Sequence, residues 1–177
     1  MGRSRYKIIE SGKTYFITSS VINWLSLFAL PALAGIVVDS LNFLQQQQRV
    51  KIHAWVLMET HFHLVATSAN ISSEMRKMKS YTARCIVDYL KANGPEFLLE
   101  QLKFYKKKHK NDQIYQVWQE GLHPKLILDE KMLTGTIEYI HYNPVKRGYV
   151  DKPEHWRYSS GRDYIGLKGL VTVKPLV

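Results

Sequence analysis

The sequence has a single cysteine, Cys85, among 177 residues, and this scarcity excludes two kinds of structure. One thiol can form no disulfide within the chain, and it cannot provide the several sulfur ligands of a multi-cysteine zinc site. Cys85 lies in the apolar-periodic stretch 81–90, where a small buried hydrophobe is commoner than a nucleophile. We therefore expect an intracellular, reducing environment and a cytoplasmic protein.

Membrane-targeting features are also scarce. The first ten residues, MGRSRYKIIE, contain no apolar core of the kind that a signal peptide has. The stretch 21–38 has no charged residue, and its length is near the lower limit for a membrane span. It is interrupted by Asn23, Pro31 and Gly35 and has no basic flank, so the sequence predicts no membrane-spanning segment.

Acidic residues are few relative to basic ones. Twenty-five Lys and Arg against 15 Asp and Glu give a formal charge of +10, and the isoelectric point is about 9.6. This excess indicates a polyanionic partner, with nucleic acid favoured over an anionic membrane surface; the alternative is a protein that is merely basic. The length and the hydrophobic fraction of 45% are those of one globular domain, which we expect to span residues 1–177.

Alternating and helical hydrophobic patterns follow one another in the order β-α-β-β-α-β, and a further helix comes last. The predicted strands are 13–20, 51–57, 61–67 and 114–119, and the predicted helices are 32–48, 74–92 and 129–142. The second helix ends at the breaker Asn93-Gly94-Pro95, a basic and less regular region follows it, and the last helix ends before Pro144. This order is typical of an α+β, ferredoxin-like fold: a split βαβ antiparallel sheet with helices on one face, plus a C-terminal helix.

Two histidines stand one residue apart in the apolar stretch 55–67, WVLMETHFHLVAT. Residues i and i+2 of a strand share a face, so His61 and His63 point one way, whereas Phe62 and Leu64 point the other way. With helices on one side of the sheet, we expect the apolar set to face the helices and the histidines to face the open side. Two neighbouring imidazoles would provide half of a divalent metal site; the alternative is a pair of satisfied core residues.

The last predicted helix offers a third ligand and a reactive group. Tyr139 and Asn143 are four residues apart, so they lie one above the other on one helix face. The carbonyl oxygen of Asn143 would add a ligand to the two imidazoles, and the phenol of Tyr139 would then lie beside the metal. The alternative is that Tyr139, one of 11 tyrosines, packs its ring and hydrogen-bonds its hydroxyl.

These residues resemble the signature of the HUH single-tyrosine (Y1) transposases of the IS200-like group, and within it of the REP-associated tyrosine transposases. That family has a strand with His-hydrophobic-His after a Met-containing turn, here residues 55–64, and a helix with Tyr-Ile-x-x-Asn-Pro-Val, here residues 139–145. Further similar stretches are Met-Lys-Ser-Tyr-Thr at 78–82, Val-Trp-Gln-Glu-Gly at 117–121 and Tyr-Ser-Ser-Gly-Arg-Asp-Tyr at 158–164. The resemblance therefore extends over nearly the whole chain.

The resemblance implies a ferredoxin-like fold, a Mg²⁺ or Mn²⁺ ion held by His61, His63 and Asn143, and Tyr139 as a nucleophile on single-stranded DNA at or near a hairpin. The phenol would form a covalent 5′-phosphotyrosine and release a 3′-hydroxyl. Attack by a second 3′-hydroxyl would then join strands without ATP, which agrees with the lack of a Gly-rich phosphate-binding motif. The resemblance further implies a nucleoid-associated monomer or homodimer that transposes DNA or processes repetitive palindromic elements.

The chain departs from the family in two places. Family members usually have Pro and then Asn or Ser before the first histidine, where this chain has Glu59-Thr60. They also tend to carry polar and charged residues where this chain has the chargeless stretch 27–38. Neither departure removes a catalytic residue, and both are compatible with a diverged or domesticated copy.

Cations and stacking aromatic rings are the groups that hold single-stranded DNA. The expected DNA contacts are Arg76, Lys77, Lys79 and Arg84 on the long helix, Lys146 and Arg147 after the tyrosine, the 103–110 cluster, and an arm with Arg3 and Arg5. Each has an alternative as an ordinary solvated charge. Two rival functions stay open: a non-catalytic DNA- or RNA-binding regulator of the same fold, and a hydrolase that activates water at the two histidines.

Overall fold

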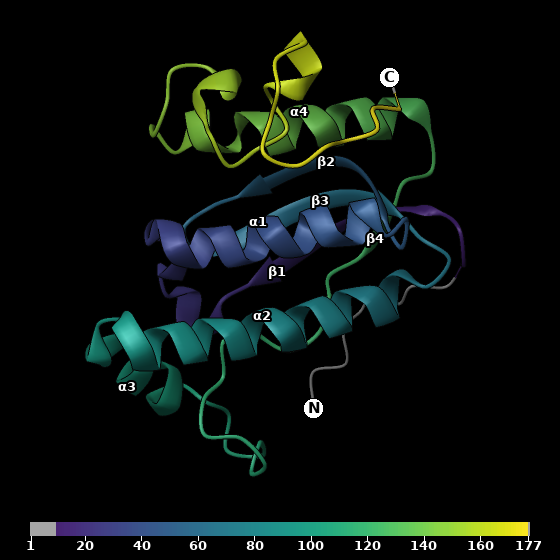
Figure 1. Cartoon of the computed structure of the whole chain (residues 1–177). Coiled ribbons are helices and arrows are strands. Elements are labelled where there is room, and N and C mark those ends of the chain that lie inside the picture. The colour runs from purple at the N-terminus through teal and green to yellow at the C-terminus, as the bar shows by residue number, and fades with distance from the viewer. Residues whose placement is uncertain (1–9, 177) are drawn as a thin grey trace.

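The computed structural model describes residues 10–176 and arranges them in three layers, with an antiparallel sheet between helix α4 on one side and helices α1 and α2 on the other (Figure 1). Within these residues the strands are β1 (Thr14–Ser20), β2 (Lys51–Leu57), β3 (His61–Thr67) and β4 (Lys125–Leu126). The helices are α1 (Pro31–Gln46), α2 (Ile71–Asn93), α3 (Glu96–Phe104) and α4 (Glu130–Lys146), with short 3-10 turns at Ile22–Trp24, Leu27–Ala29, Pro153–His155 and Asp163–Ile165. The spatial order β2-β3-β1-β4 is that of a split βαβ sheet, so the predicted α+β fold is confirmed.

The larger core lies between the sheet and the helices α1 and α2. Phe62, Leu64 and Ala66 of β3 project into it, because alternate residues of a strand share a face. The chargeless stretch 21–38 also contributes to this core, with side chains that are fully buried there, namely Val21, Leu27, Leu33 and Val37. Its apolar character is thus explained by packing, and no helix within residues 10–176 is long and apolar enough to cross a membrane.

The opposite face of the sheet is covered, which corrects the expectation of an open side. A second, smaller core forms there between the sheet and α4, made of Ala54, Val56, Met58, Val65, Leu133, Ile137 and Ile140. His61 and His63 lie beside this core and are only 5% and 6% exposed. The periodicity of the last helix shows that it has an apolar side, but it does not show which surface that side will cover.

The region between α2 and α4 differs most from expectation. Residues 114–119 form no strand of the described sheet, since Trp118 makes only an isolated bridge to Val21, and the fourth strand is the two-residue β4. Helix α3 occupies part of the region predicted to be irregular, and Leu98, Leu99 and Leu102 are its buried residues. A two-residue strand has no periodicity to detect, so the prediction of a strand at 114–119 was wrong.

Helix α4 continues through Pro144, whereas the sequence predicted an end before it. Proline removes one backbone donor, the one that would bond the carbonyl of Ile140, but neighbouring bonds persist. The amide of Arg147, for example, donates to the carbonyl of Asn143 at 3.2 Å. Ile140 and Pro144 are buried, and this packing offsets the missing hydrogen bond. The additional turn keeps Asn143 inside the helix, one turn after Tyr139.

Candidate active site

The two histidines lie side by side on β3 next to β1. His61 is the cross-strand partner of Ser20 and His63 that of Thr18, and the two imidazole centroids are 4.8 Å apart. A hydroxyl group engages each Nδ1: Thr60 Oγ1 is 2.9 Å from that of His61 and Thr18 Oγ1 is 2.8 Å from that of His63. These contacts orient both rings and leave each Nε2 as the nitrogen that can bind a ligand.

Both imidazoles are neutral at neutral pH. Burial lowers the pKa of His61, the charge of Arg147 lowers it further, and Glu59 has the opposite, smaller effect. Burial also lowers the pKa of His63 to about 3, with a contribution from the neighbouring His61. Because metal ions bind the neutral ring, the pair is in the form that can coordinate a cation.

Helix α4 holds Tyr139 above this pair. Its hydroxyl oxygen is 3.5 Å from Nε2 of His63, and the two ring centroids are 5.3 Å apart. Phe16 stacks on His63 at 5.3 Å and meets the edge of Tyr139 at 6.1 Å, while Nζ of Lys146 is 5.7 Å from the centre of the tyrosine ring. Tyr139 remains 42% exposed, so its phenol is accessible to a macromolecular substrate.

Two imidazoles of β3 could hold a metal here, and the amide of Asn143 is the candidate for a third ligand. Within residues 10–176, no three His, Cys, Asp or Glu side chains are grouped so as to hold a metal ion. A site built on His61 and His63 therefore requires a ligand of another type, and Asn143 is an amide that is only 8% exposed, one turn beyond Tyr139. Two neutral imidazoles with an amide oxygen would form a mixed nitrogen and oxygen donor set, which is a type that fits a divalent cation.

Three aromatic or hydroxyl neighbours of the histidines were missed in the sequence. Phe16 and Thr18 share a face of β1, and the alternation of the predicted strand 13–20 would have identified them had its pairing with β3 been known. Trp24 packs edge-on against His61 at 5.7 Å. Its position depends on positive φ angles at Asn23 and Trp24, 49° and 53°, for which the sequence gives no signal.

The buried side of α4 is anchored by His141. Its Nε2 is 2.8 Å from Oγ of Ser160, and that oxygen accepts a hydrogen bond from the amide of Trp55 in β2 at 2.9 Å. The ring of Tyr164 packs edge-on against the imidazole at 4.8 Å. His141 is therefore a structural residue, and burial lowers its pKa to about 4.

We expect the metal-free protein to lose stability in mild acid. The folded-state pKa values of His61, His63 and His141 lie below the ordinary value of about 6.5, so the unfolded chain binds more protons once the pH falls below that value. Each such proton lowers the unfolding free energy by about 1.4 kcal/mol per pH unit until the folded-state pKa is reached. Urea unfolding in EDTA between pH 7.5 and pH 4.5, values chosen to span this window, measures the slope. His141→Gln should reduce this slope. An unfolding free energy that does not change with pH would contradict the assignment of these histidines as buried and neutral.

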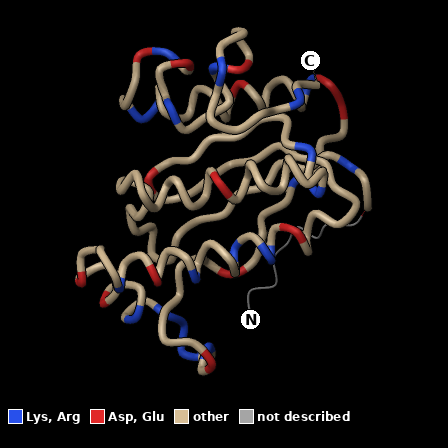
Figure 2. The backbone as a smooth tube through the Cα atoms, in the orientation of Figure 1, with Lys and Arg blue, Asp and Glu red and all other residues tan. Residues whose placement is uncertain are grey.

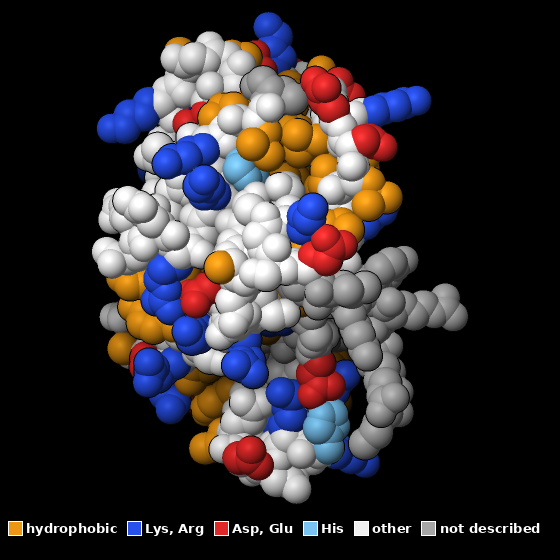
Figure 3. Space-filling model, turned by 90° about the vertical axis from the view of Figure 1, so that its right-hand side faces the viewer, with side chains coloured by type: hydrophobic (Ala, Val, Ile, Leu, Met, Phe, Trp, Pro, Cys, Tyr) orange, Lys and Arg blue, Asp and Glu red, His pale blue; other side chains and the backbone are white. Residues whose placement is uncertain are grey.

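The cationic residues predicted to contact DNA lie on both sides of the sheet. Lys146 and Arg147 are at the end of α4, where Nη1 of Arg147 is 4.0 Å from Oε1 of Glu59. Helix α2, on the other side of the sheet, carries four more, namely Arg76, Lys77, Lys79 and Arg84 (Figures 1 and 2). Arg3 and Arg5 lie outside the described residues. On the face drawn in Figure 3, basic side chains are interspersed with acidic ones, so this face presents no uniform basic patch.

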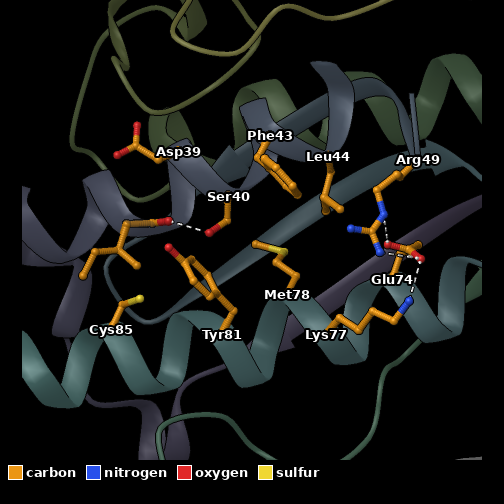
Figure 4. Close-up of a pocket in the computed structure, with 11 residues that line it drawn as sticks. Asp39, Ser40, Phe43, Leu44, Arg49, Glu74, Lys77, Met78, Tyr81 and Cys85 are labelled. Carbon is orange, nitrogen blue, oxygen red and sulfur yellow. Dashed lines mark hydrogen bonds and ion pairs between the residues drawn. The ribbon is translucent and has the colours of Figure 1, made fainter. Parts of the chain in front are cut away.

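The cations of α2 differ in their surroundings. Lys77 pairs with Glu74 at 3.3 Å and lines an apolar pocket of about 460 Å³ between α1 and α2, where Arg49 binds the same carboxylate (Figure 4). Arg76 and Lys79 line a different, more polar groove of about 880 Å³. Arg84 is exposed and is part of neither lining.

The polar groove lies between α2 and residues 110–124. In it, Nζ of Lys79 donates to the carbonyls of Gln119 and Gly121 at 2.9 and 2.8 Å, and burial lowers the pKa of this lysine to about 8. In the 103–110 cluster, which has five lysines, the single carboxylate of Glu120 contacts Lys107, His109 and Lys110 and offsets one of the positive charges.

Comparison with known proteins finds one protein with a similar sequence and a solved structure with a similar fold. A Haemophilus influenzae protein provisionally named a REP-associated tyrosine transposase is 35% identical over 74 residues. The match covers 42% of this chain and 42% of that protein, so less than half of the relative's length is spanned. No family model matches the chain.

A solved structure of a REP-associated tyrosine transposase bound to a REP hairpin superposes with a TM-score of 0.66 at 21% identity, covering 100% of this chain and 94% of that one. A provisionally assigned transposase from Deinococcus radiodurans has a TM-score of 0.44 at 14% identity over 78% of this chain and 95% of that one, which is too distant to support an argument. The resemblance that the motifs indicate is thus confirmed in sequence over 74 residues and in fold over the whole chain.

Proposed function

We propose that this chain is a REP-associated tyrosine transposase, a metal-dependent endonuclease and strand transferase that acts on hairpin-containing single-stranded DNA. The observation that carries this proposal is the position of Tyr139, whose accessible hydroxyl is 3.5 Å from Nε2 of His63, above two neutral imidazoles. A tyrosine placed only for packing would not need an exposed phenol directed at a pair of unprotonated metal-binding side chains. The sequence match and the REP hairpin bound by the fold relative support the same substrate class.

The chemistry follows from the phenol. The oxygen of Tyr139 attacks a backbone phosphorus of the DNA, the bond from phosphorus to the 3′ oxygen breaks, and the 5′-phosphate becomes joined to the tyrosine. The phenol proton is released to solvent, and the departing 3′ oxygen takes up a proton to become a hydroxyl. A phenol, with an ordinary pKa near 10, is a better leaving group than an alkyl alcohol, so a second 3′-hydroxyl can reverse the step and join new strands.

The other residues of the site orient and bind. His61 and His63, with Asn143, would hold a Mg²⁺ or Mn²⁺ ion, which supplies positive charge for the phosphate oxygens. Thr60 and Thr18 fix the orientation of the imidazoles through their Nδ1 atoms. Since one chain supplies both the histidines and the tyrosine, a single copy is sufficient to build the site, whether the protein is a monomer or a homodimer.

A direct test of the proposal is covalent trapping. Purified protein is incubated with a single-stranded hairpin oligonucleotide carrying a 3′ label and Mn²⁺, then denatured and separated by size. We expect a labelled species of protein mass that resists denaturant and is absent when EDTA is present. A protein that binds the hairpin but neither cleaves it nor forms such a species would be the non-catalytic regulator instead, whereas cleavage without a covalent species would indicate the hydrolase.

We expect Arg76→Ala to weaken hairpin binding more than Lys77→Ala, although the two residues are neighbours on α2. Arg76 is exposed and lines the polar groove, whereas Lys77 is already paired with Glu74 on the other flank of the helix. Loss of one phosphate contact should reduce the slope of log affinity against log salt by about 0.7 for single-stranded DNA. Fluorescence anisotropy at several salt concentrations measures both quantities, and equal effects of the two variants would exclude the groove as a DNA contact.

A further inference from the structure

Glu59, in the turn that leads into His61, makes contacts on both sides of that turn. Its Oε1 accepts a hydrogen bond from the hydroxyl of Tyr149 at 2.6 Å, and Arg147 lies 4.0 Å from the same oxygen. Its backbone carbonyl accepts a hydrogen bond from the amide of Phe28 at 3.0 Å. The turn is therefore tied to the residues that follow α4 and to the segment that precedes α1.

The second oxygen of this carboxylate is in an unfavourable environment. Oε2 of Glu59 is buried and has no hydrogen-bond partner among the described residues. A buried carboxylate oxygen without a partner lowers stability, because its interaction with water is lost and not replaced. Glu59 also joins no group of three potential metal ligands within residues 10–176. Neither folding stability nor direct metal coordination therefore explains why a glutamate occupies position 59. The hydrogen bond between Glu59 and Tyr149 is the contact that suggests a function for this residue.

Tyr149 transmits that contact to α4. Its amide donates to the carbonyl of Pro144 in the last turn of the helix at 3.0 Å. Its ring stacks on Trp156 at 5.5 Å, and Nε1 of Trp156 donates to the carbonyl of Leu57 at 3.0 Å, at the end of β2. The end of α4 is therefore joined to the histidine-bearing turn through Glu59 and to the neighbouring strand through Trp156.

We propose that Glu59 is a positioning residue, which binds the end of α4 to the histidine turn and so sets the separation between Tyr139 and His63. Those two side chains come from different layers, and their distance depends on how α4 is held against the sheet. The Glu59 to Tyr149 hydrogen bond joins these layers two residues before His61. The expected effect of Glu59 on the rate of DNA cleavage rests on the proposed function. Its expected effect on how firmly α4 is held does not.

Hydrogen exchange tests the structural part without any substrate. Glu59→Ala and Tyr149→Phe should each accelerate exchange of the backbone amides of Arg147, Gly148 and Tyr149 about tenfold, since a hydrogen bond to a charged group is lost. The amides of the β1–β3 ladder should not change. Combining the two substitutions should add nothing to the effect of Glu59→Ala. Glu138→Ala, which removes an exposed carboxylate from α4, is the matched charge control and should leave these rates unchanged.

Single-turnover kinetics test the catalytic part. At saturating hairpin DNA, Tyr149→Phe should slow formation of the covalent species about tenfold, with DNA affinity within about twofold of wild type. Glu59→Gln retains an acceptor for the Tyr149 hydroxyl and should restore most of the rate lost in Glu59→Ala. Unchanged exchange and unchanged rate in both single variants would overturn the proposal. If wild type forms no covalent species, the proposed function fails, whereas the exchange rates still decide the role of Glu59.

Discussion

Tyr139→Phe is expected to abolish the covalent protein–DNA species, with a loss of at least about a thousandfold, to the background of the assay. The substitution removes only the oxygen that would attack phosphorus. The ring keeps its contacts with Phe16 and His63, and within residues 10–176 the hydroxyl has one hydrogen bond, the 3.5 Å contact with Nε2 of His63. Hairpin affinity and the urea midpoint should therefore be those of wild type.

Tyr142→Phe is the matched control for this experiment. Tyr142 is on the same helix, three residues later, and is 49% exposed, close to the 42% of Tyr139. It should retain full activity, because among residues 10–176 it is Tyr139, and not Tyr142, that makes a hydrogen bond and a ring contact with His63. If Tyr139→Phe still cleaves the hairpin, the nucleophile is a water molecule, and the protein is a hydrolase that uses the two histidines.

His61→Ala and His63→Ala should each weaken Mn²⁺ binding by about a hundredfold or more and remove the metal-dependent covalent species. Loss of residues that only orient a ligand costs about 10- to 100-fold in metal affinity, so loss of a ligand itself should cost at least as much. Calorimetric titration of the DNA-free protein with Mn²⁺ measures this directly. Asn143→Ala should have a smaller effect of the same kind, because an amide oxygen is a weaker ligand than an imidazole.

The exposed His123 provides the control for the histidine variants. His123→Ala should bind Mn²⁺ with the affinity of wild type, because this residue lies just before β4 and outside the described histidine site. Undiminished binding in His63→Ala would put the ion at another position on the chain and would remove the basis for the proposed ligand set. Urea unfolding of each variant separates a lost ligand from a lost fold.

Much of the sheet was predictable because its strands alternate. The two strands around the histidines were predicted at 51–57 and 61–67, and these are the bounds of β2 and β3. Alternation also fixes which residues share a face, so the shared direction of His61 and His63 followed from spacing alone. The meeting of Tyr139 with His63 did not follow from spacing, since it requires α4 to cover the second face of the sheet. The spacing on the last helix raised it as one of two alternatives for Tyr139, and the family resemblance favoured it over packing.

Contacts between segments that are distant in the sequence could not be predicted from local sequence patterns. Glu59 and Tyr149 are separated by 90 residues, and no periodicity relates them. The same holds for Trp24, whose backbone conformation is set by the loop around it, and for β4, which is too short to have a pattern. The end of α4 was mispredicted for another reason: the rule that proline stops a helix assumes that no packing energy opposes it, whereas Pro144 is buried.

The unequal size of the two cores has a consequence for how the site fails on heating. Among residues 10–176, the core under α1 and α2 contains 30 buried apolar residues, and the one under α4 contains seven. Cooperative units held by less buried apolar surface open at a lower free energy than the whole fold. Tyr139 and Asn143 belong to the weakly held unit and the histidines to the strongly held one. The reactive arrangement is therefore a docked state of two units, and we expect it to dissociate at a temperature at which the sheet is still intact.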